Sequence, residues 1–440
     1  MNTSPPNAGA RSHACPGVGT TGWQWRWLLA APHRLAFASA AAMLATTSLW
    51  WAIAMVARSE GSEVPWSVPP FLAHGLLMCF GFMPLFICGF LFTAGPKWLA
   101  RPPVQARSLL PAVVVQLAGW AVFGAAIHAR LAQGSVVAAI GLATVATGWS
   151  MVMVSFIRML RASRVEDRSH ARVIALAGVW GAAALWLAAA GLATGQLALV
   201  RGTMLAALWG FVGIVFTAVS HRMIPFFCAS ALPALDAWRP LWLLRSFTAV
   251  LAFEAAGAFV DGFTGSASPA WRGVQAVVEL PAGLALLALA VRWGLVQSLR
   301  IRLLAMLHLG FVWLGIALVL AGASHAMQAA SAGDSSLGLA PLHAYTMGFL
   351  GSTLLAMVTR VTCGHGGRTL TADDFIWRLF WVLQLAIVVR IAAALVMGSQ
   401  PLLAPALLAS AAIGWAGVCI AWAVRYGRWY GTPRADGRPG

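Results

Sequence analysis

Uninterrupted apolar runs about as long as a bilayer is thick are the feature that most constrains this chain. A helix needs about 20 apolar residues to cross the hydrocarbon core of a membrane. Only 9% of the residues are charged and the mean hydropathy is +0.80, whereas soluble domains carry roughly 25% charged residues. The sequence therefore predicts an all-α polytopic membrane protein with about twelve transmembrane helices. The predicted spans are residues 35–57, 70–94, 109–127, 136–157, 173–194, 202–220, 243–261, 274–296, 303–321, 340–359, 379–396 and 402–424.

Other classes of protein fit the sequence poorly. A transmembrane β-barrel needs strands of alternating polarity, whereas these runs are continuous and rich in Ala and Leu. The six cysteines form no CxxC or CxxCH spacing, which argues against structural zinc, iron–sulfur clusters and covalently attached haem. The sequence contains no P-loop, dinucleotide fingerprint or recognisable hydrolase nucleophile. No catalytic motif is therefore predicted, and the question of enzymatic activity is left open.

The distribution of Lys and Arg predicts the orientation. With the N-terminus inside, 24 of the 29 basic residues fall on inner segments and four, Arg58, Arg130, Arg201 and Arg272, fall on outer loops. The remaining one, Arg390, lies within the eleventh span. Cytoplasmic loops carry an excess of Lys and Arg, so both termini are expected in the cytoplasm. The net charge of +17 then reflects topology, and the expected partner is the lipid bilayer rather than nucleic acid.

The domain organisation follows from these spans. Residues 1–34 are expected to be a flexible cytoplasmic segment, with no removable signal peptide, residues 35–424 the twelve-helix membrane domain, and residues 425–440 a cytoplasmic tail. The second and sixth spans share the pattern Gly-x-x-Phe-Thr-Ala, at 89–94 and 213–218, before a basic residue. The tenth span ends similarly at Thr359-Arg360. A four-helix repeat would explain these matches, as would chance similarity between Ala- and Gly-rich helices.

Two histidines within spans are candidates for a cofactor site. His74 lies about a turn into the second span from the outer side, and His343 lies at the same depth in the tenth. A histidine in an apolar segment is costly unless it is satisfied, and imidazole is a common axial ligand of haem iron. Two such histidines could ligate one b-type haem. The alternative is that each imidazole bonds a neighbouring helix.

The inner ends of the sixth and tenth spans carry a second set of candidates. His221-Arg222 closes the sixth span, and Arg360 and His365 close the tenth. Arginine could hold haem propionates or a small anion through bidentate bonds, and the histidines could bind a metal. His33, at the entry to the first span, is a weaker metal candidate. The alternative is topological arginine with an incidental histidine.

Three charged residues lie inside spans and need partners. They are Glu254 in the seventh, Glu279 in the eighth and Arg390 in the eleventh. A carboxylate in the middle of a membrane is either protonated or paired. A Glu254–Arg390 partnership is one way to satisfy two of them.

These motifs together resemble the NnrS family, twelve-span membrane proteins of the bacterial nitric oxide response that contain haem and copper. The resemblance rests on Pro32-His33-Arg34 and on residues 74–98, 222–227, 343–348 and 360–368, which together extend from the first span to the tenth. It implies a location in the bacterial cytoplasmic membrane, haem and copper as cofactors, and a role in relief from nitric oxide stress. A redox role through haem would be compatible with it.

The chain departs from the family pattern in the second span. The family's common pattern there is His-x-His-Glu-Met, whereas this chain has His74-Gly75-Leu76-Leu77-Met78. Leucines replace the second histidine and the glutamate, which argues against a copper site in this span. His74 is left as its only histidine, which suits an axial haem ligand.

Two other functions compete with a haem protein that binds nitric oxide or another small ligand. Twelve spans with an inner N-terminus are also typical of secondary transporters without a metal cofactor, whose helices are often broken by Gly and Pro. Haem–copper oxidases also use histidines on a second and a tenth span, but their copper centre needs adjacent histidines, and this sequence has no His-His pair. The oligomeric state is not indicated by the sequence.

Overall fold

The computed structural model describes residues 22–62, 64–129, 133–232, 235–264 and 268–438, and in these ranges it contains helices and no strand. Twelve helical spans are long and apolar enough to cross a membrane, which confirms the predicted fold class. The spans are α1 (Pro32–Ser59), α2–η2–α3 (Pro70–Leu76, Leu77–Gly81, Met83–Trp98), α4 (Ala106–His128), α5 (Gly134–Ala162), α6 (Ser169–Ala193), α7–η3–α8 (Leu197–Ala207, Leu208–Gly213, Ile214–Ala231), α9 (Leu241–Thr264), α10 (Pro269–Arg292), α12 (Arg302–Ala330), α13–η4–α14 (Ala340–His343, Ala344–Gly351, Ser352–His365), α15 (Asp374–Val396) and α16 (Leu403–Tyr430). Two short helices, η1 (Trp25–Ala30) and α11 (Leu295–Ser298), lie outside the spans.

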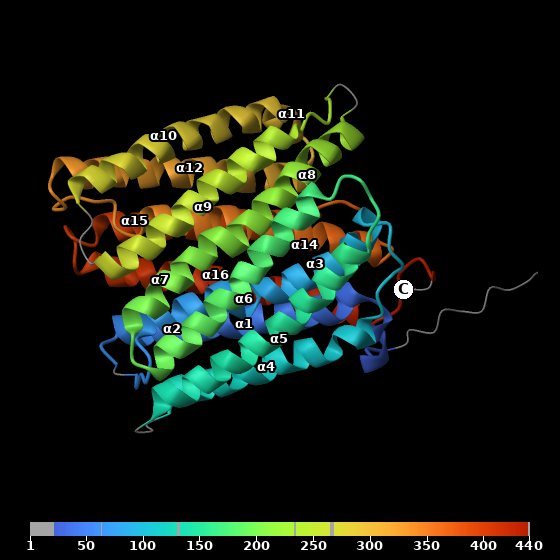
Figure 1. Cartoon of the computed structure of the whole chain (residues 1–440), viewed down its shortest axis with the longest axis horizontal. Helices are drawn as coiled ribbons and strands as arrows, with labels where there is room; N and C mark the ends of the chain where they lie inside the picture. The colour runs from blue at the N-terminus through green and yellow to red at the C-terminus, as the bar shows by residue number, and fades with distance from the viewer. Residues whose placement is uncertain (1–21, 63, 130–132, 233–234, 265–267, 439–440) are drawn as a thin grey trace, which may run out of the picture.

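The described ends of the chain lie side by side at one end of the bundle (Figure 1). The backbone N–H of Gln24 donates to the carbonyl of Gly431 over 2.8 Å. We call this the inner end, after the charge distribution, and the opposite end the outer end. Residues 1–21 of the predicted N-terminal segment lie outside the described residues. The helices also extend beyond the predicted apolar windows, with α1 starting at Pro32 and α16 ending at Tyr430.

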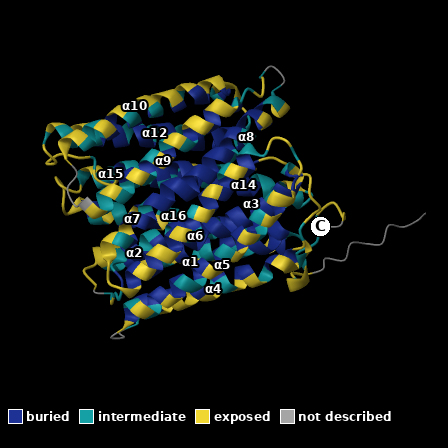
Figure 2. Ribbon diagram, viewed as in Figure 1, coloured by how far each residue is buried: buried dark blue, intermediate teal, exposed yellow. Residues whose placement is uncertain are grey.

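The second, sixth and tenth spans form the centre of the bundle. In these spans 83%, 89% and 78% of the most apolar stretch is buried, against 28% to 67% in the other nine. Figure 2 shows the same contrast, with buried residues in the middle of the bundle and exposed residues along α4 and α10 at its edges. The nine peripheral spans therefore face lipid on one side, whereas the three central spans contact mostly protein.

A π-helical segment interrupts each of the three central spans. The segments η2, η3 and η4 end at Gly81, Gly213 and Gly351. Such segments insert an extra residue into a helix and occur often at functional sites. Their occurrence in spans that are four apart in the chain agrees with a four-helix repeat.

Gly213 shows why a glycine is needed at such a segment. The Tyr345 hydroxyl donates to the carbonyl of Leu208 over 2.9 Å, and a Cβ on Gly213 would collide with that hydroxyl. Tyr345 also stacks on Trp209, with ring centroids 3.7 Å apart. Since this carbonyl lies in a π-helical turn, the bond satisfies a backbone group that would otherwise be costly to bury. The contact joins the sixth span to the tenth.

Candidate functional site

The outer ends of the second and tenth spans bring two candidate histidines together. His74 lies in α2 and His343 ends α13, and the two imidazoles are close enough to interact electrostatically. Trp51 of α1 stacks on His74 with ring centroids 3.9 Å apart. Each histidine has an intermediate degree of exposure. The indole thus covers one face of one imidazole, while both side chains keep some free surface.

The hydrogen bonds of these histidines leave ring nitrogens available. Nδ1 of His343 lies 2.9 Å from the carbonyl oxygen of Leu339. Because a carbonyl only accepts, Nδ1 carries the proton and Nε2 keeps its lone pair. Metal-ligating histidines are commonly fixed in this way, through a bond from the other ring nitrogen to a backbone carbonyl. Nδ1 of His74 is buried and has no hydrogen-bond partner within the described residues.

Arg390 of α15 adds a positive charge to this site. It interacts electrostatically with both His74 and His343. Its Nη1 is buried without a hydrogen-bond partner, and no described carboxylate forms an ion pair with it. A buried guanidinium without a counter-charge is costly, so the site suits a ligand that carries an anionic group. The predicted Glu254–Arg390 partnership is not formed, because Glu254 pairs instead with Glu279.

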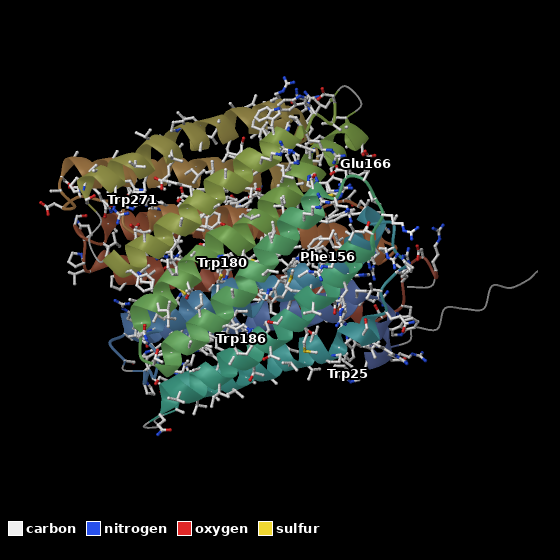
Figure 3. All side chains as sticks on the ribbon, viewed as in Figure 1. Trp25, Phe156, Glu166, Trp180, Trp186 and Trp271 are labelled. Atoms are coloured by element: carbon white, nitrogen blue, oxygen red, sulfur yellow. The ribbon has the colours of Figure 1, made fainter. Side chains whose placement is uncertain are left out.

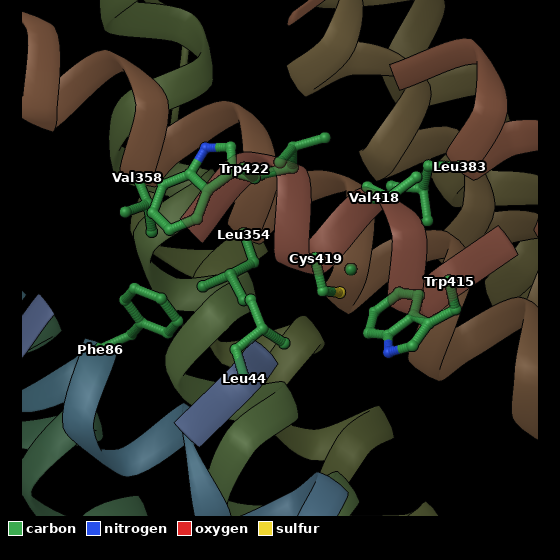
Figure 4. Close-up of a pocket in the computed structure, with 11 residues that line it drawn as sticks. Leu44, Phe86, Leu354, Val358, Leu383, Trp415, Val418, Cys419 and Trp422 are labelled. Carbon is green, nitrogen blue, oxygen red and sulfur yellow. The ribbon is translucent and has the colours of Figure 1, made fainter. Parts of the chain in front are cut away.

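An apolar cavity lies among the five spans that carry this site or its immediate neighbours. It has a volume of about 20 Å³ and lies between the first, second, tenth, eleventh and twelfth spans (Figure 4). Trp415 and Trp422 of α16 contribute to its wall. A Cβ on Gly351 would lie only 2.9 Å from the Trp415 ring, so the glycine leaves room for that ring. The cavity lies deeper in the bundle than the histidine pair, since Gly351 follows His343 by eight residues, or about 12 Å of helix, and its walls are apolar.

His221 forms a different kind of pair at the inner end. Its Nδ1 lies 3.0 Å from Nε2 of His170, and its Nε2 lies 3.2 Å from the carbonyl oxygen of Pro240. The carbonyl requires Nε2–H as donor, which leaves Nδ1 to accept from His170. Both nitrogens of His221 are thus engaged, and the side chain is fully buried. A saturated imidazole of this kind holds helices together and has no free lone pair for a metal.

His365 lies against His33 rather than against His221. The two rings have centroids 4.7 Å apart, and Nδ1 of His33 is buried without a partner among the described residues. The surrounding charges are positive, from Arg34, Lys97 and Arg434. Arg434 is itself held by Asp436 over 2.6 Å, which raises the pKa of that guanidinium. The predicted inner histidines therefore do not form one set: His221 pairs with His170, and His365 with His33.

Arg222 and Arg360 connect the inner ends of the central spans. The guanidinium of Arg222 lies 5.1 Å from the centre of the Trp98 ring, and that of Arg360 lies 3.8 Å from the centre of the Phe227 ring. These cation–π contacts join the sixth span to the second and the tenth to the sixth. Arg360 follows His343 by 17 residues, which is about 25 Å along a helix. Neither arginine therefore belongs to the His74/His343 site, because both lie at the opposite end of the bundle.

Two residues of this arrangement were missed as site residues by sequence reasoning. Arg390 was noted only as a charge in need of a partner, although it is the one basic residue that the inside–outside count leaves over. His170, which is not among the residues predicted above, is buried at the start of α6. Its distance from the fifth span could have revealed His170, since this residue precedes the apolar run by one helical turn.

Side chains that can bind a metal do not form large clusters within the described residues. No three His, Cys, Asp or Glu side chains converge there in a way that could hold a metal ion. Copper at His33 and His365 would have two imidazoles, but the neighbouring Arg34 and Lys97 would repel a cation. We therefore propose no copper site.

A comparison with protein families places the chain in a known one. The family model described as NnrS protein matches residues 27–434, a range that includes all twelve spans. No curated protein matches the chain significantly.

Proposed function

Because the chain belongs to the NnrS family, we propose that it is a haem protein of the bacterial cytoplasmic membrane that acts in the response to nitric oxide. In this proposal His74 and His343 are the axial ligands of one b-type haem. One observation carries it: two imidazoles at the outer ends of two central spans lie within electrostatic range of each other, and each has a ring nitrogen without a hydrogen-bond partner among the described residues.

The neighbouring residues fit such a group. The bond from His343 Nδ1 to Leu339 holds that ring with Nε2 available, and Arg390 would pair with a haem propionate through charge-assisted hydrogen bonds. Trp51 packs against the His74 ring and limits its rotation. If both imidazoles held the haem, it would supply electron exchange rather than an open position for a gas.

A visible spectrum tests the cofactor assignment. Protein purified in detergent from haem-sufficient cells should show the Soret and α bands of a low-spin b-type haem, and electron paramagnetic resonance should show two imidazole ligands. Protein that purifies folded and without haem under these conditions would contradict the assignment.

A deletion strain tests the physiological role. Cells without the protein should grow more slowly than wild type in the presence of a nitric oxide donor, with a smaller difference in peroxide. A plasmid copy of the wild-type gene should restore growth, and a copy with His343→Ala should not. The matched control is His128→Ala, since His128 lies at the outer end of α4 and bonds Trp50. Equal growth of all strains would refute the nitric oxide assignment.

A secondary transporter is the second candidate, and one observation favours it. A cavity of about 430 Å³ lies in the inner half of the bundle, with Ser246, Ala285 and Leu314 among its lining residues. This reading predicts that a cysteine introduced at Ser246 reacts with a thiol reagent added from the inner side, at a rate that changes when substrate is present. A constant rate with every solute tested would contradict it.

A further inference from the structure

Two carboxyl groups lie buried beside each other within the membrane domain. Glu254 of α9 is 8% exposed and Glu279 of α10 is fully buried. Their side chains are within hydrogen-bonding reach of each other, and one oxygen of each, Oε1, has no partner within the described part of the chain. Two carboxyl groups can share a hydrogen bond only when one of them carries a proton, because ionised carboxylates only accept. A hydrogen bond between Glu254 and Glu279 therefore requires a proton on one of the two.

His325 of α12 connects this pair to the outer end. Its Nδ1 lies 2.7 Å from Oε2 of Glu279, and its Nε2 lies 3.3 Å from Nη1 of Arg272. Arginine only donates, so Nε2 must be the acceptor and Nδ1 must carry the proton. The proton of the imidazole thus points at the buried carboxyl pair. Arg272 sets this tautomer without being able to carry a proton itself.

The outer end of this connection reaches the surface. Arg272 is held by Asp261 over 2.6 Å and by Gln275 over 2.8 Å, and Trp271, at the outer end in Figure 3, donates to Asp261 over 3.1 Å. The side chains of Asp261, Arg272 and His325 are 24%, 18% and 19% exposed, whereas Glu279 is 0% exposed. Exposure falls from the surface to the carboxyl pair, so a proton from the outer side can reach His325.

The inner side of the pair has no comparable connection. The cavity of about 430 Å³ begins about one helical turn inward, at Val250 and Ala282, and extends to Arg292. Its walls are mainly aliphatic and aromatic, and Arg292 is the titratable residue among them. Among the described residues, the hydrogen bonds that start from the pair therefore lead to the outer side.

We propose that Glu254 and Glu279 form a proton-binding site that is loaded from the outer side of the membrane through His325. A proton arriving at Nε2 of His325 allows the ring to release the Nδ1 proton to Glu279, which shares it with Glu254. The ring returns when Nδ1 regains a proton or the two nitrogens exchange roles. The charged and titratable groups that face the pair are Asp261 on α9, Arg272 on α10, His325 on α12 and Tyr345 on η4. The proposal does not depend on haem.

Infrared spectroscopy of the full chain tests the site and the role of His325. The stretching band of a protonated carboxyl should be present in the wild type and should be altered or lost in Glu254→Gln and Glu279→Gln. In His325→Asn the amide can still donate to Glu279, but it cannot bind and release a proton. Exchange of the carboxyl proton for deuterium should then become about tenfold slower, equivalent to about 1.4 kcal/mol in the barrier. His128→Ala is the matched outer-end control and should exchange at the wild-type rate.

Labelling with dicyclohexylcarbodiimide tests the side of access. This apolar reagent reacts with protonated carboxyl groups, and mass spectrometry identifies the modified residue. In right-side-out vesicles, modification of Glu254 or Glu279 should fall as the pH of the medium rises. In inside-out vesicles with a fixed internal pH, it should not change with the medium.

Three results would overturn the proposal. The first is the absence of any carboxyl band that depends on Glu254 or Glu279. The second is wild-type exchange in His325→Asn. The third is modification that follows the pH of the medium equally in both kinds of vesicle.

Discussion

The two histidine pairs at opposite ends of the bundle differ in how fully their nitrogens are used. At the inner end, His221 is bonded on one side to His170 and on the other to the carbonyl of Pro240. At the outer end, His343 is bonded at Nδ1 alone, and Nδ1 of His74 has no partner among the described residues. The described hydrogen bonds use both nitrogens of His221, whereas at the outer pair they leave a ring nitrogen of each histidine without a partner.

This difference teaches how to separate structural from ligand-binding histidines in a membrane protein. Burying a polar group is costly unless it is hydrogen-bonded, so an unpartnered buried nitrogen requires an explanation. At the outer pair the proposed haem would supply one, and Arg390, which forms no ion pair with a described carboxylate, interacts electrostatically with both imidazoles. At the inner pair no ligand is needed. Three predictions test this distinction, and a fourth concerns an exposed carboxylate away from both pairs.

The largest effect is expected when the histidines of the two pairs are removed in turn. His74→Ala and His343→Ala should each lose most of the haem absorbance, since one axial ligand is missing. His170→Ala and His221→Ala should keep a wild-type ratio of haem to protein. The Soret absorbance of purified variants, normalised to protein, decides between the outcomes. Full haem retention in both outer variants, or loss in an inner variant, would reverse the assignment.

The next effect concerns Arg390, whose charge is unpaired. Arg390→Gln should weaken haem retention by about tenfold to a hundredfold, because a hydrogen bond to a charged group contributes about 1.5–3 kcal/mol. The haem-free protein should become no less stable, since a buried charge without a partner is removed. Haem transfer to apomyoglobin and thermal unfolding in detergent measure the two quantities. Arg302→Gln, at a partly exposed ion pair, is the control. Wild-type haem retention in Arg390→Gln would exclude a role for Arg390 in the site.

A smaller effect is expected from the inner pair on stability. His221→Ala leaves His170 without its partner and should lower the free energy of unfolding by about 1–3 kcal/mol. The double variant His170→Ala/His221→Ala should lose less than the sum of the two single variants, because residues in contact are coupled. Thermal unfolding of the four proteins gives the coupling. Strict additivity would mean that the pair does not stabilise the fold.

The smallest effect is expected at an exposed polar group. Partial burial tends to raise the pKa of Asp373, but bonds from the Ile376 amide and the Arg425 guanidinium outweigh it and lower the pKa overall. The stabilisation is therefore present above the unfolded pKa of about 3.9 and is lost as the pH falls through the lower folded value. Because the side chain is half exposed, the contribution should be at most about 1 kcal/mol. Asp373→Asn should remove this pH dependence, as hydrogen exchange at the start of α15 can measure. An unchanged pH dependence would assign it to another group.

The depth of a buried polar residue in the membrane could be predicted from the sequence, whereas its partner could not. The depth of His74 and His343 is readable because each lies at a fixed distance from the end of an apolar run. The partners of Glu254 and His221 are not readable in this way. Sequence reasoning suggested Arg390 for Glu254 and grouped His221 with His365, whereas the structure pairs them with Glu279 and His170. Depth depends on position along one helix, but pairing depends on which faces of two helices meet.

The class of protein, the twelve spans and the charge bias between their two ends can all be read from the amino-acid sequence. The bilayer imposes these features on each stretch of chain separately, because every span must be long and apolar enough to replace water with lipid. Which three spans form the centre, and which buried polar groups satisfy one another, follows from the packing of the helices. Those choices depend on helix rotation and close contact, as where Gly213 admits the Tyr345 hydroxyl. Such contacts join residues far apart in the chain, so no local pattern of hydrophobicity or charge specifies them.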